Sequence, residues 1–239
     1  MIIWALFDSE NDTVKKTLSQ FEGVEVYSFG IGLGASHIHL DLSNFELARV
    51  ELDKYPKPDI IFASPPCEVW CFVSVGVKRH YTIEPGINLY WKNKWTAFNF
   101  TNKHIERLKN GISTLETISK IIEWYKPRYW FIENGTRSLA FAYLKEVLGL
   151  TGYKNLTNYY SYGFDYFKPT TIYSNILLQL QNNSPNTELV KLKNHISGYT
   201  KLQLSKLRSK VPSCLYLDIF EQAKFGGVPL LNFSFGEIL

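Results

Sequence analysis

Short apolar segments of strand length, separated by enough residues for a turn or a helix, restrict the fold of this chain more than any other feature. These segments are Ile2–Phe7, Val24–Phe29, Ile38–Leu40, Asp59–Ala63 and Arg128–Glu133. Apolar runs of this length, bounded by glycine, proline or polar residues, are typical of buried strands. Because parallel strands need a crossover connection, usually a helix, the spacing predicts βαβ units on a parallel sheet.

Several of the connecting segments have helical patterns. The most regular is His104–Tyr125, where Leu108, Ile112 and Leu115 lie on one face at helical spacing. Further helices are expected at Asn11–Gln20, Phe45–Leu52, Ser138–Leu148 and Pro212–Lys224, and further strands at Asn155–Ser161 and Thr170–Ile176. The predicted fold class is therefore α/β, with a mostly parallel central sheet and helices on both faces.

The composition excludes several classes of protein. Of the 239 residues, 45% are hydrophobic and 20% are charged, which is typical of a soluble globular protein. Three cysteines are too few, and odd in number, for a secreted disulfide framework. The start of the chain lacks the basic region of a signal peptide, and no apolar run is long enough to span a membrane. We therefore expect a cytoplasmic protein without membrane contact; the sequence gives no indication of its oligomeric state.

The segment 68–102 is predicted to be an irregular insertion in which basic residues, among them Lys78 and Arg79, alternate with aromatic ones. Such a surface suits nucleic acid, since bases stack on aromatic rings and phosphates attract cations. The net charge of +4 permits that partner without requiring it. The alternative is a loop whose aromatic residues pack only against one another.

Two predicted strands end in reactive side chains. Asp59–Ala63 leads into Ser64-Pro65-Pro66-Cys67, and Arg128–Glu133 ends on a carboxyl group. Ligands of open parallel sheets bind beyond the carboxyl ends of the strands, so the thiol and the carboxyl group are expected to face one pocket. This pair suits attack of a thiolate on an electron-poor ring whose nitrogen the carboxyl group hydrogen-bonds or protonates. Cys67 and Cys71 lack partners at zinc-site spacing, so no metal is expected.

Four pieces of the sequence resemble the small, phage-type DNA cytosine-5 methyltransferases. They are Pro58-Asp59 with Ala63–Cys67, Lys126–Asn134, Tyr162-Gly163 with Lys168–Thr170, and Ser209–Pro212. Their order and spacing also agree with the family, and together they cover most of residues 1–225. The resemblance implies a Rossmann-like fold of the kind that binds S-adenosylmethionine, and a role in phage or restriction-modification systems.

By this resemblance, Cys67 attacks C6 of a cytosine flipped out of DNA, and a methyl group passes from S-adenosylmethionine to C5. Glu133 holds N3 and the exocyclic amine of the base, and Asn134 braces the loop that carries Glu133. Pro66, together with Pro65, shapes the turn that aims the thiol. Lys168, like Lys78 and Arg79 in the insertion, is expected to contact DNA.

The cofactor half departs from the family pattern. A glycine-rich turn normally follows the first strand, but Phe7, Asp8 and Ser9 begin a turn without glycine. The second strand is followed by the glycine-rich segment 30–34 in place of a carboxylate, and we interpret that segment as a turn. Asp41 stands where an acid is often found near the adenine. The predicted cofactor contacts are Phe7, Asp8, Ser9, Asp41 and Pro65.

Three explanations of this departure remain open. The chain binds S-adenosylmethionine through a variant loop; it uses another donor or another nucleotide substrate; or it has lost the cofactor and keeps a DNA-binding or structural role. Enzymes like thymidylate synthase also place a cysteine after Pro-Pro, but there a histidine follows and here Glu68 does. In the predicted domain organisation, residues 1–179 form the catalytic domain with its 68–102 insertion. Residues 180–239 form a small basic DNA-contact segment and a helix that packs back on the core.

Overall fold

The computed structural model describes residues 1–8, 12–31, 38–67, 70, 102–184 and 210–226, and for 102–105 the backbone only. In this part of the chain seven strands form one sheet in the order β3-β2-β1-β4-β5-β7-β6. The strands are β1 (Ile2–Leu6), β2 (Glu25–Gly30), β3 (Ile38–His39), β4 (Ile60–Ala63), β5 (Tyr129–Gly135), β6 (Tyr153–Asn158) and β7 (Pro169–Ser174). The first five strands of this order are parallel, and β7 is antiparallel to both of its neighbours.

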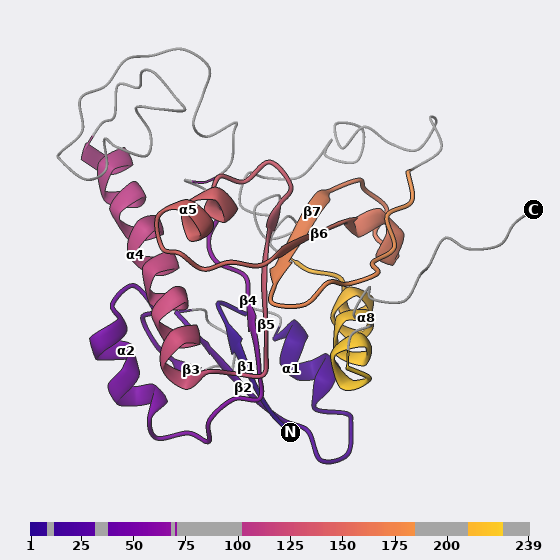
Figure 1. The fold of residues 1–239 in the computed structure, drawn as a ribbon, viewed down its shortest axis with the longest axis horizontal. Coiled ribbons are helices and arrows are strands. Elements are labelled where there is room, and N and C mark those ends of the chain that lie inside the picture. The colour runs from indigo at the N-terminus through magenta and orange to yellow at the C-terminus, as the bar shows by residue number, and fades with distance from the viewer. Residues whose placement is uncertain (9–11, 32–37, 68–69, 71–101, 185–209, 227–239) are drawn as a thin grey trace, which may run out of the picture.

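Helices cover both faces of the sheet (Figure 1). They are α1 (Thr13–Leu18), α2 (Phe45–Leu52), α4 (Asn102–Tyr125), α5 (Ala140–Glu146) and α8 (Ser213–Lys224), with a short 3-10 helix, η1 (Tyr159–Tyr162). The predicted class, a Rossmann-like α/β fold with a mostly parallel sheet and helices on both faces, is confirmed. None of the helices in the described ranges is long and apolar enough to cross a bilayer.

The central strands bury side chains on both faces, as buried parallel strands must. In β1, Trp4 and Leu6 join the core under α2, α4 and α5, whereas Ile3 and Ala5 join the core under α1, α8 and η1. This alternation explains why the predicted strand segments are continuous apolar runs without a polar face. The same alternation determines which helix layer is contacted by each residue that follows the end of a strand.

The register of the three central strands aligns their carboxyl ends. Leu6 pairs with Ala63, and Ala63 pairs with Ile132. The residues that follow this aligned set are Ser64, directly after β4, and Glu133 in β5. They therefore lie at the same level of the sheet. The two predicted reactive segments start at one edge of the sheet, as the sequence predicted.

The sixth strand ends earlier than predicted. Asn155–Ser161 was expected to be a strand, but β6 covers Tyr153–Asn158 and the chain then enters η1. The side chain of Asn158 accepts a hydrogen bond from the backbone N–H of Ser161 at 2.9 Å, which caps the new helix. An asparagine whose side chain bonds nearby backbone groups favours a helix cap over continued strand pairing. The tyrosines that follow Asn158 are typical of strands, so the sequence did not reveal the cap.

Gly152 precedes the β6–β7 hairpin in a site with no room for a side chain. A Cβ atom there would lie 2.7 Å from the carbonyl oxygen of Ser174 and 2.7 Å from the Trp130 ring. We predict that Gly152→Ala lowers the free energy of unfolding by about 1–3 kcal/mol, the usual cost of overpacking. Urea titration measures the change. The matched control is Gly135→Ala, because no atom lies within 4 Å of its added Cβ; equal losses in both variants would contradict this explanation.

Candidate functional site

The turn that carries Cys67 is anchored on both sides. Before it, the backbone N–H of Ser64 donates to the carbonyl of Leu6 at 3.1 Å, which extends the β1–β4 pairing by one residue. After it, the N–H of Trp70 donates to the carbonyl of Cys67 at 3.1 Å, and the Trp70 side chain is fully buried. Cys67 itself is an exposed thiol. The two prolines and these anchors fix the backbone of an accessible sulfur.

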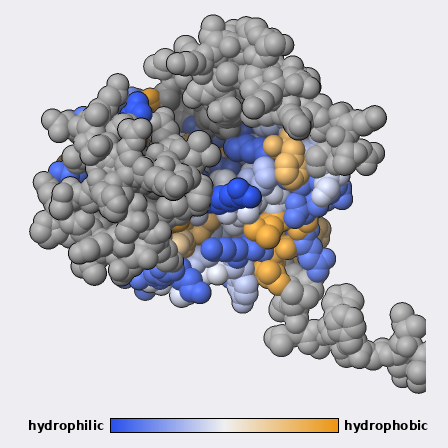
Figure 2. Space-filling model, turned by 90° about the horizontal axis from the view of Figure 1, so that it is seen from above, coloured by the Kyte–Doolittle hydropathy of each residue, from blue (hydrophilic) through white to orange (hydrophobic). Residues whose placement is uncertain are grey.

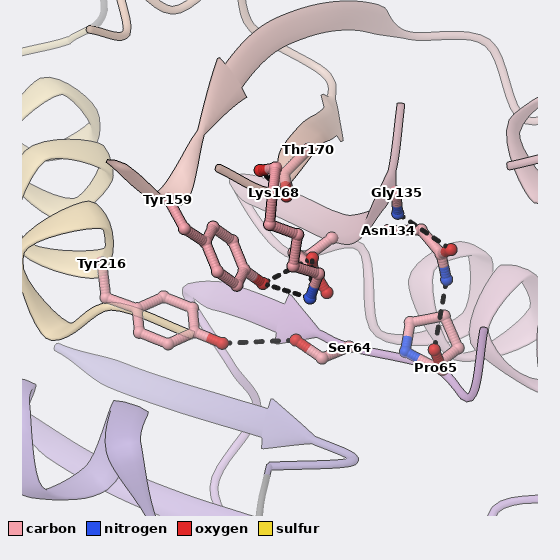
Figure 3. A network of polar contacts seen from close by, with 9 residues as sticks. Ser64, Pro65, Asn134, Gly135, Tyr159, Lys168, Thr170 and Tyr216 are labelled. Atoms are coloured by element: carbon pink, nitrogen blue, oxygen red, sulfur yellow. Dashed lines mark hydrogen bonds and ion pairs between the residues drawn. The ribbon is translucent and has the colours of Figure 1, made fainter. Parts of the chain in front are cut away.

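Asn134 connects the end of β5 to the same turn. Its side-chain amide donates to the carbonyl of Pro65 at 3.2 Å, and its oxygen accepts from the N–H of Gly135 at 3.0 Å (Figure 3). Asn134 is only 1% exposed. Because both ends of the amide are used, Asn134 sets the distance between the β5 terminus and the turn of Pro65 and Pro66. Its predicted bracing role is compatible with this contact and stays a prediction.

Glu133 is a nearly buried carboxyl group at the end of β5, with 9% of the residue exposed. The hydroxyl of Tyr159 donates to its Oε1 atom at 2.7 Å, and Lys168 Nζ lies 3.8 Å from the same oxygen. Lys168 Nζ also donates to the Tyr159 hydroxyl at 3.1 Å (Figure 3). Burial and the nearby Glu133 charge raise the pKa of Tyr159 well above its usual value, so its hydroxyl keeps its proton.

A second buried tyrosine, Tyr216 of α8, contacts the residue that precedes the turn of Pro65 and Pro66. The hydroxyls of Tyr216 and Ser64 lie 3.2 Å apart, and either can donate (Figure 3). Burial, and then the charge of Asp8, raise the pKa of Tyr216 well above its usual value. Tyr216 therefore supports the turn from the side of the sheet that faces α1 and α8.

The predicted cofactor residues are only partly brought together. Phe7 has φ +57°, a left-handed conformation normally taken by glycine, and its N–H donates to the carbonyl of Phe29 at 2.9 Å. Asp8 is 8% exposed and accepts from the Ser28 hydroxyl at 3.3 Å. Asp41 is exposed beyond the edge strand β3, where its carboxylate accepts from the Ser43 N–H at 2.8 Å. The tight turn expected after β1 is present without glycine, whereas Asp41 lies two strands away.

Some of the predicted site residues lie outside the described residues. They are Ser9, Lys78 and Arg79, and most of the insertion 68–102 lies there as well. Within the described ranges no group of three potential metal ligands is present.

The sequence analysis missed Tyr159, Tyr216 and Ser28. All three have buried hydroxyl groups with a polar partner. Tyr159 bonds Glu133 and Ser28 bonds Asp8, which the sequence did single out, and Tyr216 bonds Ser64, which directly precedes Pro65. A buried tyrosine usually finds a partner for its hydroxyl, but which partner depends on the tertiary fold. The local signal, a run of tyrosines in residues 159–166, points equally to an ordinary core.

Figure 2 shows the molecule from above the view of Figure 1, with hydrophilic and hydrophobic residues of the described chain lying side by side. No family model matches the chain, and no curated protein matches it. Among solved structures it is similar to one provisionally assigned as a DNA modification methyltransferase encoded within a prophage of E. coli. The identity is 11% and the TM-score 0.44, over 84% of this chain and 56% of the other. The chain thus spans little more than half the length of that structure, and a likeness of this size carries no functional argument.

The contribution of the Asn134–Pro65 contact to the position of the Cys67 thiol can be tested by mutation. We predict that Asn134→Ala lowers stability by about 1–3 kcal/mol, because Pro65 loses a buried partner, and also changes the alkylation rate of Cys67. Mass spectrometry of the Cys67 peptide after iodoacetamide treatment measures that rate. The control is Asn175→Ala, since Asn175 bonds the Trp130 N–H and the Arg128 carbonyl at the other end of β5. A changed Cys67 rate in the control would show that general loosening is the cause.

Proposed function

We propose that this protein is a DNA cytosine-5 methyltransferase. The observation that carries the proposal is the nearly buried Glu133 carboxyl group at the end of β5, next to the strand that leads into the exposed thiol of Cys67. A fixed carboxyl group and an accessible thiol are the two groups needed to bind and attack an electron-poor pyrimidine ring. The sequence resemblance gives the same pair the same roles.

In the proposed reaction, the Cys67 thiolate forms a bond to C6 of a flipped cytosine. Glu133 accepts a hydrogen bond from the exocyclic amine and holds a proton between its carboxyl group and N3. The π electron pair of the C5–C6 bond then becomes available at C5. S-adenosylmethionine, when bound, would supply the electrophilic methyl group to C5 and leave as S-adenosylhomocysteine. The C5 proton then passes to water, its electron pair returns to the ring, the Cys67–C6 bond breaks, and the thiolate is restored.

The residues after β1 fit S-adenosylmethionine in charge and in backbone shape. The molecule carries a positive sulfonium and a positive ammonium group, and Asp8 offers a carboxylate held by Ser28. Phe7 takes the left-handed conformation for which the family uses glycine. We propose that Phe7, Asp8 and Pro65 line the cofactor site, with Ser9 and Asp41 as outer contacts.

DNA is the proposed partner. Lys168 is part of the Glu133 cluster, and it keeps a quarter of its side chain exposed for a contact with the flipped nucleotide. We propose Lys78, Arg79 and the basic residues 180–210 as further DNA contacts, and a division of the chain at residue 179. The helix α8 packs against α1, which fits the proposal that the C-terminal part returns to the core.

The nucleophile is tested with duplex DNA that contains 5-fluorocytosine, in which fluorine cannot leave as a cation and the enzyme stays attached. We predict a covalent complex on a denaturing gel with the wild-type protein and none with Cys67→Ala, because that variant lacks the sulfur. Cys214→Ala is the matched control, since Cys214 is also an exposed thiol. A complex that persists in Cys67→Ala contradicts the assignment. DNA binding without any complex would favour a retired methyltransferase that only binds DNA.

The cofactor site is tested by isothermal titration with S-adenosylmethionine. We predict that Asp8→Asn weakens binding about tenfold, because a charge-assisted contact to the cation is lost. Asp53→Asn is the control, since Asp53 accepts a hydrogen bond from Tyr125, the last residue of α4, on the side where the chain enters the strands and not where it leaves them. Unchanged affinity in Asp8→Asn removes Asp8 from the site. Absence of binding by the wild-type protein at millimolar ligand overturns the choice of donor.

A further inference from the structure

The hydrogen-bond chain at the end of β5 has a fixed direction. An ammonium group only donates and an ionised carboxylate only accepts. Since Lys168 Nζ donates to the Tyr159 hydroxyl, the hydroxyl proton is left to bond Glu133 Oε1, and the order is Lys168 to Tyr159 to Glu133. The raised pKa of Tyr159 keeps that proton in place. The orientation of the tyrosine hydroxyl is thus set from both sides.

Tyr159, and not Lys168, makes the direct contact with the carboxyl group. The hydroxyl lies 2.7 Å from Oε1, whereas Lys168 Nζ lies 3.8 Å from it, beyond hydrogen-bond distance. Both contacts fall on Oε1. Among the described residues, Oε2 therefore stays available to a ligand while Oε1 serves as the fixed point of the carboxyl group.

The position of Tyr159 is determined by its backbone and by packing. Its N–H donates to the carbonyl of Lys168 at 3.1 Å, one step beyond the last β6–β7 pair, Asn158 with Pro169. Its ring is fully buried, stacks edge-on against Phe164 with centroids 5.5 Å apart, and lies 4.2 Å from Lys168 Nζ. A rigid ring with two torsion angles, held in this way, is a precise support for a neighbouring carboxyl group.

We propose that Tyr159 is the positioning residue of Glu133, fixing Oε1 so that Oε2 and the carboxyl plane meet the N3 and amine edge of the flipped cytosine. This inference rests on the proposed function and deepens it. Tyr159 touches Glu133 and not the base, so its removal acts on the reaction step and leaves DNA affinity in place. Rates fall steeply when a catalytic group is misplaced by even a fraction of a bond length.

The test compares Tyr159→Phe with Tyr173→Phe in the full chain. Tyr173 is an equally buried tyrosine, and its hydroxyl donates to the Leu150 carbonyl at 2.7 Å, away from Glu133. Each variant loses one buried hydroxyl. The measurement is the rate of covalent trapping on 5-fluorocytosine DNA as a function of DNA concentration, in the presence of S-adenosylmethionine.

We expect Tyr159→Phe to lower the trapping rate at saturating DNA about 10- to 100-fold, with half-saturation within about twofold of wild type. Tyr173→Phe is expected to keep the wild-type rate. An unchanged rate in Tyr159→Phe, or equal losses in both variants, overturns the positioning role while the methyltransferase proposal stands. Absence of a trapped complex with the wild-type protein overturns the proposed function, and the inference falls with it.

A double-mutant cycle in urea tests the contact without any catalysis. We expect the effects of Tyr159→Phe and Glu133→Gln on the unfolding equilibrium constant to be non-additive by about tenfold, since the charge-assisted part of their hydrogen bond can be lost only once. The Tyr173→Phe and Glu133→Gln pair should be additive. Additivity in the first pair would show that Tyr159 does not act on Glu133, whatever the activity.

Discussion

The parallel pairing of β1, β4 and β5 is the constraint on which the rest of the site depends. It ends on one rung, Leu6 with Ala63 and Ala63 with Ile132. The register of these buried strands is fixed, since a shift of one residue would exchange the side chains of the two cores, such as Trp4 with Ile3. The segments that carry Cys67 and Glu133 therefore follow the aligned strands at the same level of the sheet. Their further arrangement requires only short contacts, such as Asn134 to Pro65.

The carboxyl group of Glu133 and the hydroxyls of Tyr159 and Tyr216 are buried at this edge, and each has a polar partner. An uncompensated carboxylate would be costly in a poorly hydrated site, so Glu133 is paired with a hydroxyl and a nearby ammonium group. The two buried tyrosines deliver their hydroxyls from different elements, η1 and α8, to different strands. The layer formed by α1, α8 and η1 thus supplies polar support as well as apolar packing.

The central strands were predictable from short continuous apolar runs, and the helices from apolar residues at helical spacing, because both patterns report burial directly. Cys67 and Glu133 were predicted as candidate site residues because each lies at the end of an apolar run or in the turn after it, a relation visible along the chain. Tyr159 was not, since its value comes from contacts with Lys168 and Glu133 that the hairpin creates. The conformation of Phe7 was also hidden: glycine is the usual signal for a positive φ, and this backbone takes it without glycine.

The contact between Ser64 and Tyr216 joins residues 152 positions apart. A ribosome makes β4 and the Pro-Pro turn long before it makes α8, and strands can pair only as their partners appear. The Ser64 hydroxyl, in the turn before Cys67, therefore lacks its Tyr216 partner until the chain has been synthesised to residue 216. The support that α8 gives to the turn of Cys67 therefore forms only after most of the chain has been synthesised.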